Sequence, residues 1–217
     1  MMGVRQAASD AFLYLELGIL PIKYEIHKRQ LSFLHHIINL AEEDPVKKVW
    51  RNQTSLPKHT CWWHDVQQLL AYYSLDFDEQ AWKEMSRDAF KRMIKEAIID
   101  RALMDLSKEN NNKKRTKNLT FNNINTQKYI KTMNPKDAKI IFKCRSKTLS
   151  IKEHMKYKFR DQTCRWCGIG EETLQHVVNC GEETKIDNVH GILREMELSQ
   201  LQEVSTRVEN FLSKVEV

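Results

Sequence analysis

Glycine and proline are scarce in this chain, whose 217 residues include six Gly and four Pro. Folds rich in β-strands and tight turns use more of both, because glycine supplies positive φ angles and proline presets turn geometry. The scarcity therefore favours a mostly α-helical protein. Hydrophobic residues make up 41% and charged residues 29% of the chain, so we expect a buried core and no extensive disorder.

Long apolar segments are also missing from the sequence. No run approaches the roughly 18 apolar residues of a membrane-spanning helix. The first residues, Met1 to Gln6, are not followed by the apolar segment of a signal peptide. We therefore expect an intracellular protein with no membrane partner, in which thiols stay reduced. Its five cysteines are then metal ligands or small core residues.

Positive charge is concentrated in one stretch of the chain. Residues 108–160 contain 16 Lys and Arg and three acids, a net charge of +13, whereas residues 1–107 carry −1 and residues 161–217 carry −6. Such a block attracts polyanions, and release of their counterions drives binding. The alternative is a solvated face or a linker without a partner. The run at 113–117 (KKRTK) could act as a nuclear import signal, which favours the nucleus over the cytoplasm.

Apolar periodicity and capping residues predict a series of helices. Residues 8–40 have a helical pattern with a break near Gly18 and Pro21, and Asp44 precedes Pro45 as an N-cap precedes a proline at the first helical position. Residues 108–118 contain no apolar side chain and are predicted to be a linker or mobile loop. Further helices are expected at about 79–107, 135–146, 173–179, 184–196 and 199–213.

The most specific motif is C-x2-C-x8-H-x3-C, formed by Cys164, Cys167, His176 and Cys180. Two cysteines separated by two residues form a turn with both sulfurs on one side, and Gly168 permits the close backbone approach. His176 and Cys180 have the i, i+4 spacing of one helix face. Three sulfurs and one nitrogen make a closed tetrahedral set, which predicts a structural Zn²⁺ site. The alternative is four unrelated residues in a reduced chain.

Other cysteines, histidines and aromatic residues are interpreted as structural. Cys61 lies between His59 and His64, and a Cys/His pair could make a thiolate nucleophile. No orienting partner or glycine-rich turn accompanies them, so we expect buried or capping roles. Cys144 lies in a basic helix and is expected to fill space in the core. The Trp and Tyr residues between 62 and 73 could stack on bases, although helical spacing favours packing.

These features predict a mostly α fold, a helical bundle followed by a small CCHC zinc module. The expected organisation is a helical region at 1–107, a basic linker and helix at 108–160, and the zinc module with C-terminal helices at 161–217. The acidic flanks of the module contrast with the basic block before it.

Two groups of segments resemble the C-terminal part of non-LTR retrotransposon (LINE-like, jockey-type) reverse transcriptases. The N-terminal group is similar to the helical segment after the polymerase palm, in or beside the thumb. The C-terminal group is similar to the family's CCHC motif with its basic lead-in. Residues 42–130 match only in helical character. The segments are 13–26 (LYLELGILPIKYEI), 29–40 (RQLSFLHHIINL), 145–153 (RSKTLSIKE), 158–161 (KFRD), 164–168 (CRWCG) and 171–176 (EETLQH).

The chain departs from this family at the catalytic centre. The family's palm contains a two-aspartate turn after an aromatic residue, and the nearest match here is Asp76-Phe77-Asp78, which we interpret as a loop and an N-cap. The resemblance therefore implies a chain that is not an enzyme on its own and has no small-molecule substrate. It also implies zinc ligation by the CCHC residues, binding of RNA or DNA, and a reverse-transcriptase palm domain as a possible partner.

The leading hypothesis is a non-catalytic nucleic-acid-binding piece of such a reverse transcriptase. The alternative is a protein-interaction module that docks on a polymerase domain or another partner, with zinc purely structural. For nucleic acid, Arg165 and Trp166 are candidate contacts to a base or a phosphate. The expected phosphate contacts are Lys113, Lys114, Arg115, Lys117, Lys139, Lys143, Arg145, Lys147, Lys152, Lys156, Lys158 and Arg160.

Overall fold

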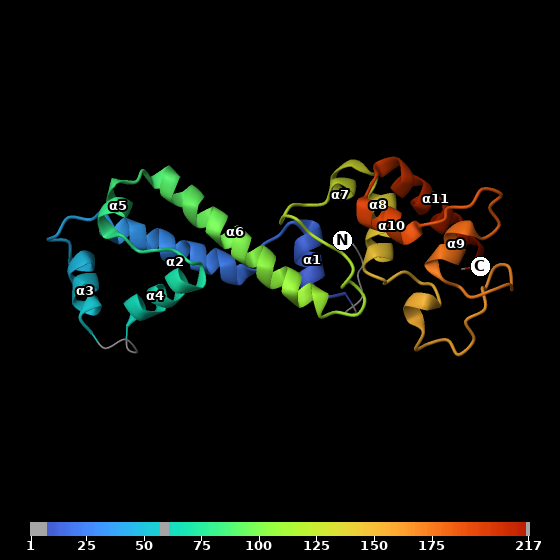
Figure 1. The fold of residues 1–217 in the computed structure, drawn as a ribbon, viewed down its shortest axis with the longest axis horizontal. Helices are drawn as coiled ribbons and strands as arrows, with labels where there is room; N and C mark the ends of the chain where they lie inside the picture. The colour runs from blue at the N-terminus through green and yellow to red at the C-terminus, as the bar shows by residue number, and fades with distance from the viewer. Residues whose placement is uncertain (1–7, 57–60, 216–217) are drawn as a thin grey trace. The chain divides into compact units, whose positions relative to one another are not determined.

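The computed structural model describes residues 8–56 and 61–215, and within these ranges the protein is helical, with a single isolated β-bridge and no strand ladder. This confirms the mostly α fold class (Figure 1). No helix in the described ranges combines the length and the apolar character needed to cross a membrane. The helices are α1 (Asp10–Leu17), α2 (Ile22–Ile38), α3 (Pro45–Thr54), α4 (Trp62–Tyr72), α5 (Glu79–Glu84), α6 (Arg87–Asn111), α7 (Lys128–Thr132), α8 (Pro135–Arg145), α9 (Leu174–Asn179), α10 (Val189–Glu195) and α11 (Leu198–Val215), with a 3₁₀ turn at Glu153–Met155.

The chain forms two compact units. Unit 2 comprises Leu20–Asp105, and unit 1 comprises the residues before and after it, up to Ile19 and from Leu106. The predicted division placed α1 with the N-terminal bundle, whereas the structure places it in unit 1. The predicted regions 108–160 and 161–217 share one hydrophobic core, in which Phe142, Val177 and Phe211 are fully buried. They therefore fold as one body.

In unit 2, helices α2 and α6 run antiparallel. Tyr24, near the start of α2, donates a hydrogen bond of 3.0 Å to Asp105 of α6. His35, near the end of α2, stacks on Phe90 near the start of α6, with 4.2 Å between the ring centroids. The two helices therefore contact each other through side chains near both ends of α2, and Figure 1 shows them crossing at an angle.

Aromatic side chains fill the core of unit 2 next to His35 and Phe90. Trp63 contacts Trp50 and Phe77 edge-on, and Phe77 in turn contacts Trp82. Trp50, Trp63 and Trp82 are buried. The interpretation of Trp63 as a core residue is thereby confirmed, and its contacts place it among rings rather than on an open surface.

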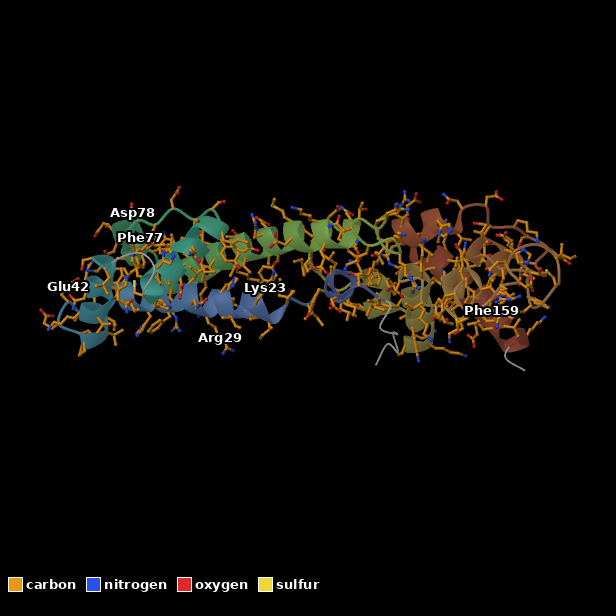
Figure 2. All side chains as sticks on the ribbon, turned by 90° about the horizontal axis from the view of Figure 1, so that it is seen from below. Lys23, Arg29, Glu42, Phe77, Asp78 and Phe159 are labelled. Atoms are coloured by element: carbon orange, nitrogen blue, oxygen red, sulfur yellow. The ribbon has the colours of Figure 1, made fainter. Side chains whose placement is uncertain are left out.

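Capping side chains set the helix starts that the sequence predicted. Asp44 accepts a hydrogen bond from the backbone of Val46, and the side chain of Asn134 caps α8 in the same way. Asp78 caps α5, so the interpretation of Asp76-Phe77-Asp78 as a loop and an N-cap is confirmed; Phe77 and Asp78 are labelled in Figure 2.

The predicted helix at 79–107 is interrupted in the structure. The backbone of Met85 is extended, and the Ser86 hydroxyl accepts a hydrogen bond of 3.2 Å from Ala89, which starts a new helix. The break lets Trp82 and Phe90 enter the same core, with ring centroids 5.1 Å apart. The prediction failed because apolar periodicity continues across the break and hides the N-cap signal of Ser86.

The predicted linker at 108–118 comprises the end of α6 and the turns that follow it, held by two buried residues. Helix α6 continues to Asn111. The buried Asn110 amide donates to the carbonyl of Thr116 at 3.0 Å, and Thr116 is itself buried. A polar side chain thus holds the turn that follows α6, which composition alone does not reveal.

A buried ion pair connects the two chain segments that make up unit 1. Arg145 of α8 donates to both carboxylate oxygens of Glu16 in α1, at 2.6 and 3.0 Å, and Tyr129 of α7 donates to the same carboxylate at 2.6 Å. Arg145 also donates to the backbone carbonyl of Leu193 in α10. Both charged side chains are almost completely buried. Four helices are thereby tied to one pair of charges.

The backbone after α1 packs too closely for any residue but glycine. Gly18 has φ +66°, and a Cβ atom there would lie 2.1 Å from the backbone nitrogen of Thr126. The Thr126 hydroxyl and the Gln127 N–H donate to the carbonyls of Leu17 and Glu16. These bonds fix α1 on unit 1 next to the ion pair.

We expect Glu16→Gln to destabilise unit 1 by about 3–5 kcal/mol, because it leaves the buried Arg145 guanidinium without a counter-charge. Chemical denaturation followed by far-UV circular dichroism measures this change. Glu209→Gln, which breaks the exposed pair with Lys136 in the same unit, is the control and should cost less than about 1 kcal/mol. Equal losses in the two variants would contradict the assigned role.

Candidate metal centre and its basic surroundings

The first two ligands of the CCHC set lie in a tight turn. A single antiparallel bridge joins Thr163 to Glu171, and the Cys164 N–H donates to the Gly170 carbonyl at 2.9 Å. Gly168 and Gly170 both have positive φ angles, of +68° and +73°. The chain reverses between Cys164 and Glu171, so both cysteine sulfurs point to one side, as their spacing predicts.

The other two ligands come from α9. The Thr173 side chain caps this helix by accepting from the His176 N–H at 3.1 Å. Cys180 is the C-cap residue of the same helix. The helix therefore presents His176 and Cys180 toward the turn, and the expected helix at 173–179 is confirmed.

The four side chains converge on a volume the size of one metal ion. Their ligand atoms all lie within 4.8 Å of one another. The sulfurs of Cys164 and Cys180 are 3.8 Å apart, and the Cys167 sulfur is 3.3 Å from Nε2 of His176. A tetrahedral ion with bonds of about 2.3 Å to sulfur and 2.05 Å to nitrogen requires separations of about 3.8 and 3.6 Å. The residues therefore fit a tetrahedral metal ion.

The metal-free thiols have pKa values that differ in direction. The Ile169 N–H points at the Cys167 sulfur at 3.3 Å, and this hydrogen bond lowers the pKa of Cys167. Burial raises the pKa of the Cys180 thiol to about 12. A cation at the centre favours the thiolates, so metal binding releases protons and weakens at acidic pH.

A buried carboxylate supports the turn from behind. Glu172 accepts hydrogen bonds from the backbone N–H groups of Lys152 and Arg165, each at 3.0 Å. It also pairs with the Arg165 guanidinium, 2.7 Å away. These bonds and the Arg165 guanidinium hold the pKa of Glu172 below its usual range against the opposing effect of burial. Arg165, predicted to contact nucleic acid, is thus held against the metal turn.

The other predicted contact residue of the turn is also used internally. Trp166 packs edge-on against Phe211 of α11, and the Lys214 ammonium lies 4.0 Å from the centre of its ring. Gly181 faces the same ring with φ +77°, and a Cβ atom there would lie 2.8 Å from it. Trp166 therefore attaches the metal turn to the rest of unit 1.

Two of the predicted phosphate contacts are buried and must be corrected. Arg145 pairs with Glu16, as described above. The Lys152 ammonium pairs with Asp161 at 2.9 Å and donates to the Thr163 carbonyl at 2.6 Å. Charge composition could not distinguish these two buried cations from the exposed ones around them. The partner of Arg145 is distant in sequence, and the partner of Lys152 follows a turn. The other predicted lysines and arginines are exposed or partly exposed: Lys113, Lys114, Arg115, Lys117, Lys139, Lys143, Lys147, Lys156, Lys158 and Arg160.

Two basic residues near this surface were missed. His190 and Arg194 of α10 border a cavity with Arg115 and Lys147. They lie in a segment that is acidic on average, so no local signal in the sequence points to them. Only the packing of α10 beside the end of α8 brings them there.

No further convergent group of metal ligands exists in the part of the chain that the structure describes. His59 lies outside the described residues. Cys144 is buried, as predicted. Comparisons of the chain with family models, curated proteins and solved structures found no match.

We expect Glu172→Gln to weaken metal binding about 10–100-fold, because the carboxylate orients the turn that carries Cys164 and Cys167. Titration of the metal-free protein with Co²⁺, followed by its thiolate absorption bands, measures the affinity. The neighbouring Glu171→Gln removes an exposed carboxylate and should leave the affinity unchanged. An unchanged affinity in Glu172→Gln would show that the turn does not depend on this support.

Proposed function

We propose that unit 1 is a zinc-stabilised helical module that binds RNA or DNA and catalyses no reaction by itself. The observation that carries this proposal is the state of the basic block. Three of the 16 Lys and Arg in residues 108–160, all of which the structure describes, form ion pairs with acids: Lys136, Arg145 and Lys152. Among the residues that the structure describes, the other cations have no such partner, and all of them belong to unit 1.

The choice of zinc rests on the ligand chemistry. Three thiolates and one imidazole in a tetrahedral arrangement suit Zn²⁺ better than Mg²⁺ or Ca²⁺, which prefer oxygen ligands. All four positions come from the protein, so no position is left for a reactive water. Zinc in this site has a structural role, and its binding energy contributes to folding of the turn.

We expect one zinc ion per chain in protein purified without chelator. Cys164→Ser and His176→Ala should each lower the zinc content and increase hydrogen exchange first in residues 160–182, because metal binding there is coupled to folding. Elemental analysis and hydrogen-exchange mass spectrometry measure these effects. Cys61→Ser, outside the cluster, is the control and should retain its zinc. Full zinc content in both ligand variants would refute the assignment.

The basic surface supports a polyanion rather than an acidic protein segment as partner. Exposed cations come from three segments: the turn after α6, α8 and the segment before Cys164. They are too many and too widely spread to serve a single ion pair with a protein partner. Contacts of lysine and arginine with phosphate track the backbone without reading bases, because the phosphates carry no sequence information.

We expect binding of single-stranded RNA or DNA whose affinity falls steeply with salt. The triple variant Lys113→Glu, Lys114→Glu, Lys117→Glu should weaken binding and reduce the slope of log K against log[salt] by roughly one per lost phosphate contact. Fluorescence anisotropy over a salt series measures this. The matched control is Lys48→Glu, Lys83→Glu, Lys95→Glu, which makes the same charge change on unit 2. Salt-independent affinity, or no binding at low salt, would contradict the proposal.

The absence of catalysis is proposed on the role of the nearest aspartate pair. Asp78 caps α5, and its carboxylate accepts a backbone N–H at 3.0 Å. Its position at a helix start does not match the paired aspartates that hold metal ions in polymerases. Descent from a jockey-type reverse transcriptase stays a proposal carried by the sequence segments quoted above.

Another candidate function is docking of a protein partner on unit 2. One face of α2 exposes Ile22, Ile26 and Phe33, whose exposed fractions are 74%, 50% and 46%. Their spacing places them on one side of the helix, with the outward-pointing Arg29 between them (Figure 2). Exposed apolar side chains of this size favour a protein interface, such as a polymerase palm domain. This function belongs to the other unit and is compatible with the first.

A further inference from the structure

A cavity of about 240 Å³ opens on unit 1, away from the four metal ligands. Three chain segments that are distant in sequence line it: the turn after α6, the end of α8 and α10. Its polar lining consists of Arg115, Asn118, Lys147, His190 and Arg194, together with the already paired Arg145. No acidic residue lines it.

The cations around this cavity are not neutralised within the described part of the chain. Arg145 has its charge satisfied by Glu16. Arg115, Lys147 and Arg194 form no ion pair with an acid, although α10 carries Glu195 next to Arg194. Like charges gathered without a counter-ion oppose folding, so their arrangement suits an anion supplied from outside.

The backbone holds two of these cations in place. Lys147 has φ +52°, a left-handed conformation that is unfavourable for a lysine. It is held by hydrogen bonds on both sides, from the Thr148 N–H to the Lys143 carbonyl at 2.9 Å and from the Arg115 guanidinium to the Lys147 carbonyl at 3.3 Å. Arg115 and Lys147 are therefore coupled through the backbone at the rim of the cavity.

A buried histidine lies near the same cations. His154 is 6% exposed. Burial is the largest cause that lowers the pKa of His154, to about 3, and the nearby Lys147, Arg115 and His190 lower it further.

We propose that this cavity binds one phosphate group, held by Arg115, Lys147, Arg194 and His190, with the Asn118 amide as a further donor. Guanidinium and ammonium groups recognise phosphate by charge-assisted hydrogen bonds, and the lining offers no carboxylate to repel it. The proposal rests on the proposed function, in that the phosphate belongs to the backbone of a bound polynucleotide. A free phosphate or a mononucleotide carries the same chemistry, and the experiment distinguishes the sources.

The test uses the full chain loaded with metal. Arg194→Gln with Lys147→Gln removes two cations from the cavity, and Lys156→Gln with Lys158→Gln removes two exposed cations of the same unit outside it. We expect the cavity variant to lose at least tenfold in affinity for single-stranded RNA or DNA and the control to lose severalfold less, because a built pocket contributes more than diffuse charge. Arg194→Gln alone, an exposed position, keeps the test valid if the double variant unfolds.

Inorganic phosphate and a nucleoside monophosphate, measured by isothermal titration calorimetry, separate the sources. Weak phosphate binding that competes with the polynucleotide, and is lost in the cavity variant, supports the proposal. A second outcome is phosphate binding that is lost in the cavity variant, while neither the unmodified chain nor any variant binds a polynucleotide. This result supports the cavity as a site for a small phosphate and overturns the proposed function. Equal polynucleotide losses in both double variants overturn the cavity and leave the proposed function standing.

Discussion

The buried pair between Glu16 and Arg145 is the interaction on which the arrangement of unit 1 depends. It joins residues 129 positions apart and also receives the Tyr129 hydroxyl, while Arg145 donates to the Leu193 carbonyl. Both charges are desolvated. Such a pair adds little net stability compared with an apolar replacement of the same volume, whereas removal of one partner alone is strongly destabilising. Its effect is therefore positional: α1, α7, α8 and α10 satisfy both charges only in one arrangement. That arrangement also brings α10 beside the end of α8, where the cavity lies.

The metal centre solves a different problem, because the turn that carries it has little hydrophobic core of its own. Cys164 and Cys180 are buried, while Cys167 is exposed. A metal ion held by the four ligands would close the turn on α9, while Glu172 fixes the backbone of the turn and Trp166 packs it against Phe211. Each of these contacts alone is modest, and together they attach a polar loop to a helical body. Arg165 and Trp166 are occupied in this attachment, which moves the expected contacts with nucleic acid away from the motif.

Local features of the molecule were predictable from the sequence, and features made by distant segments were not. The four ligands converge as their spacing predicts, because Cys164–Cys167 is one turn and His176–Cys180 is one helix end. Helix starts at proline and aspartate caps were found for the same reason. The burial of Arg145 depends on a partner in α1, so neither its spacing nor its neighbours could show it. The membership of α1 in unit 1 and the cavity beside α10 have the same non-local origin.

The fate of each cation in the basic block follows from where its backbone lies. Arg145 and Lys152 emerge on sides of their segments that face the core, and a charge in a medium of low dielectric constant must find an opposite charge or hydrogen-bond acceptors. Both do so. Cations on the outer sides need no partner because water solvates them. Folding does not constrain these side chains, so they remain available to contact a ligand. Arg115 and Lys147 fall between these cases: they are half-buried, near one another and without an acid. Partial burial removes some of their solvation without supplying a counter-charge, so an anion would gain more by binding there than on the open surface.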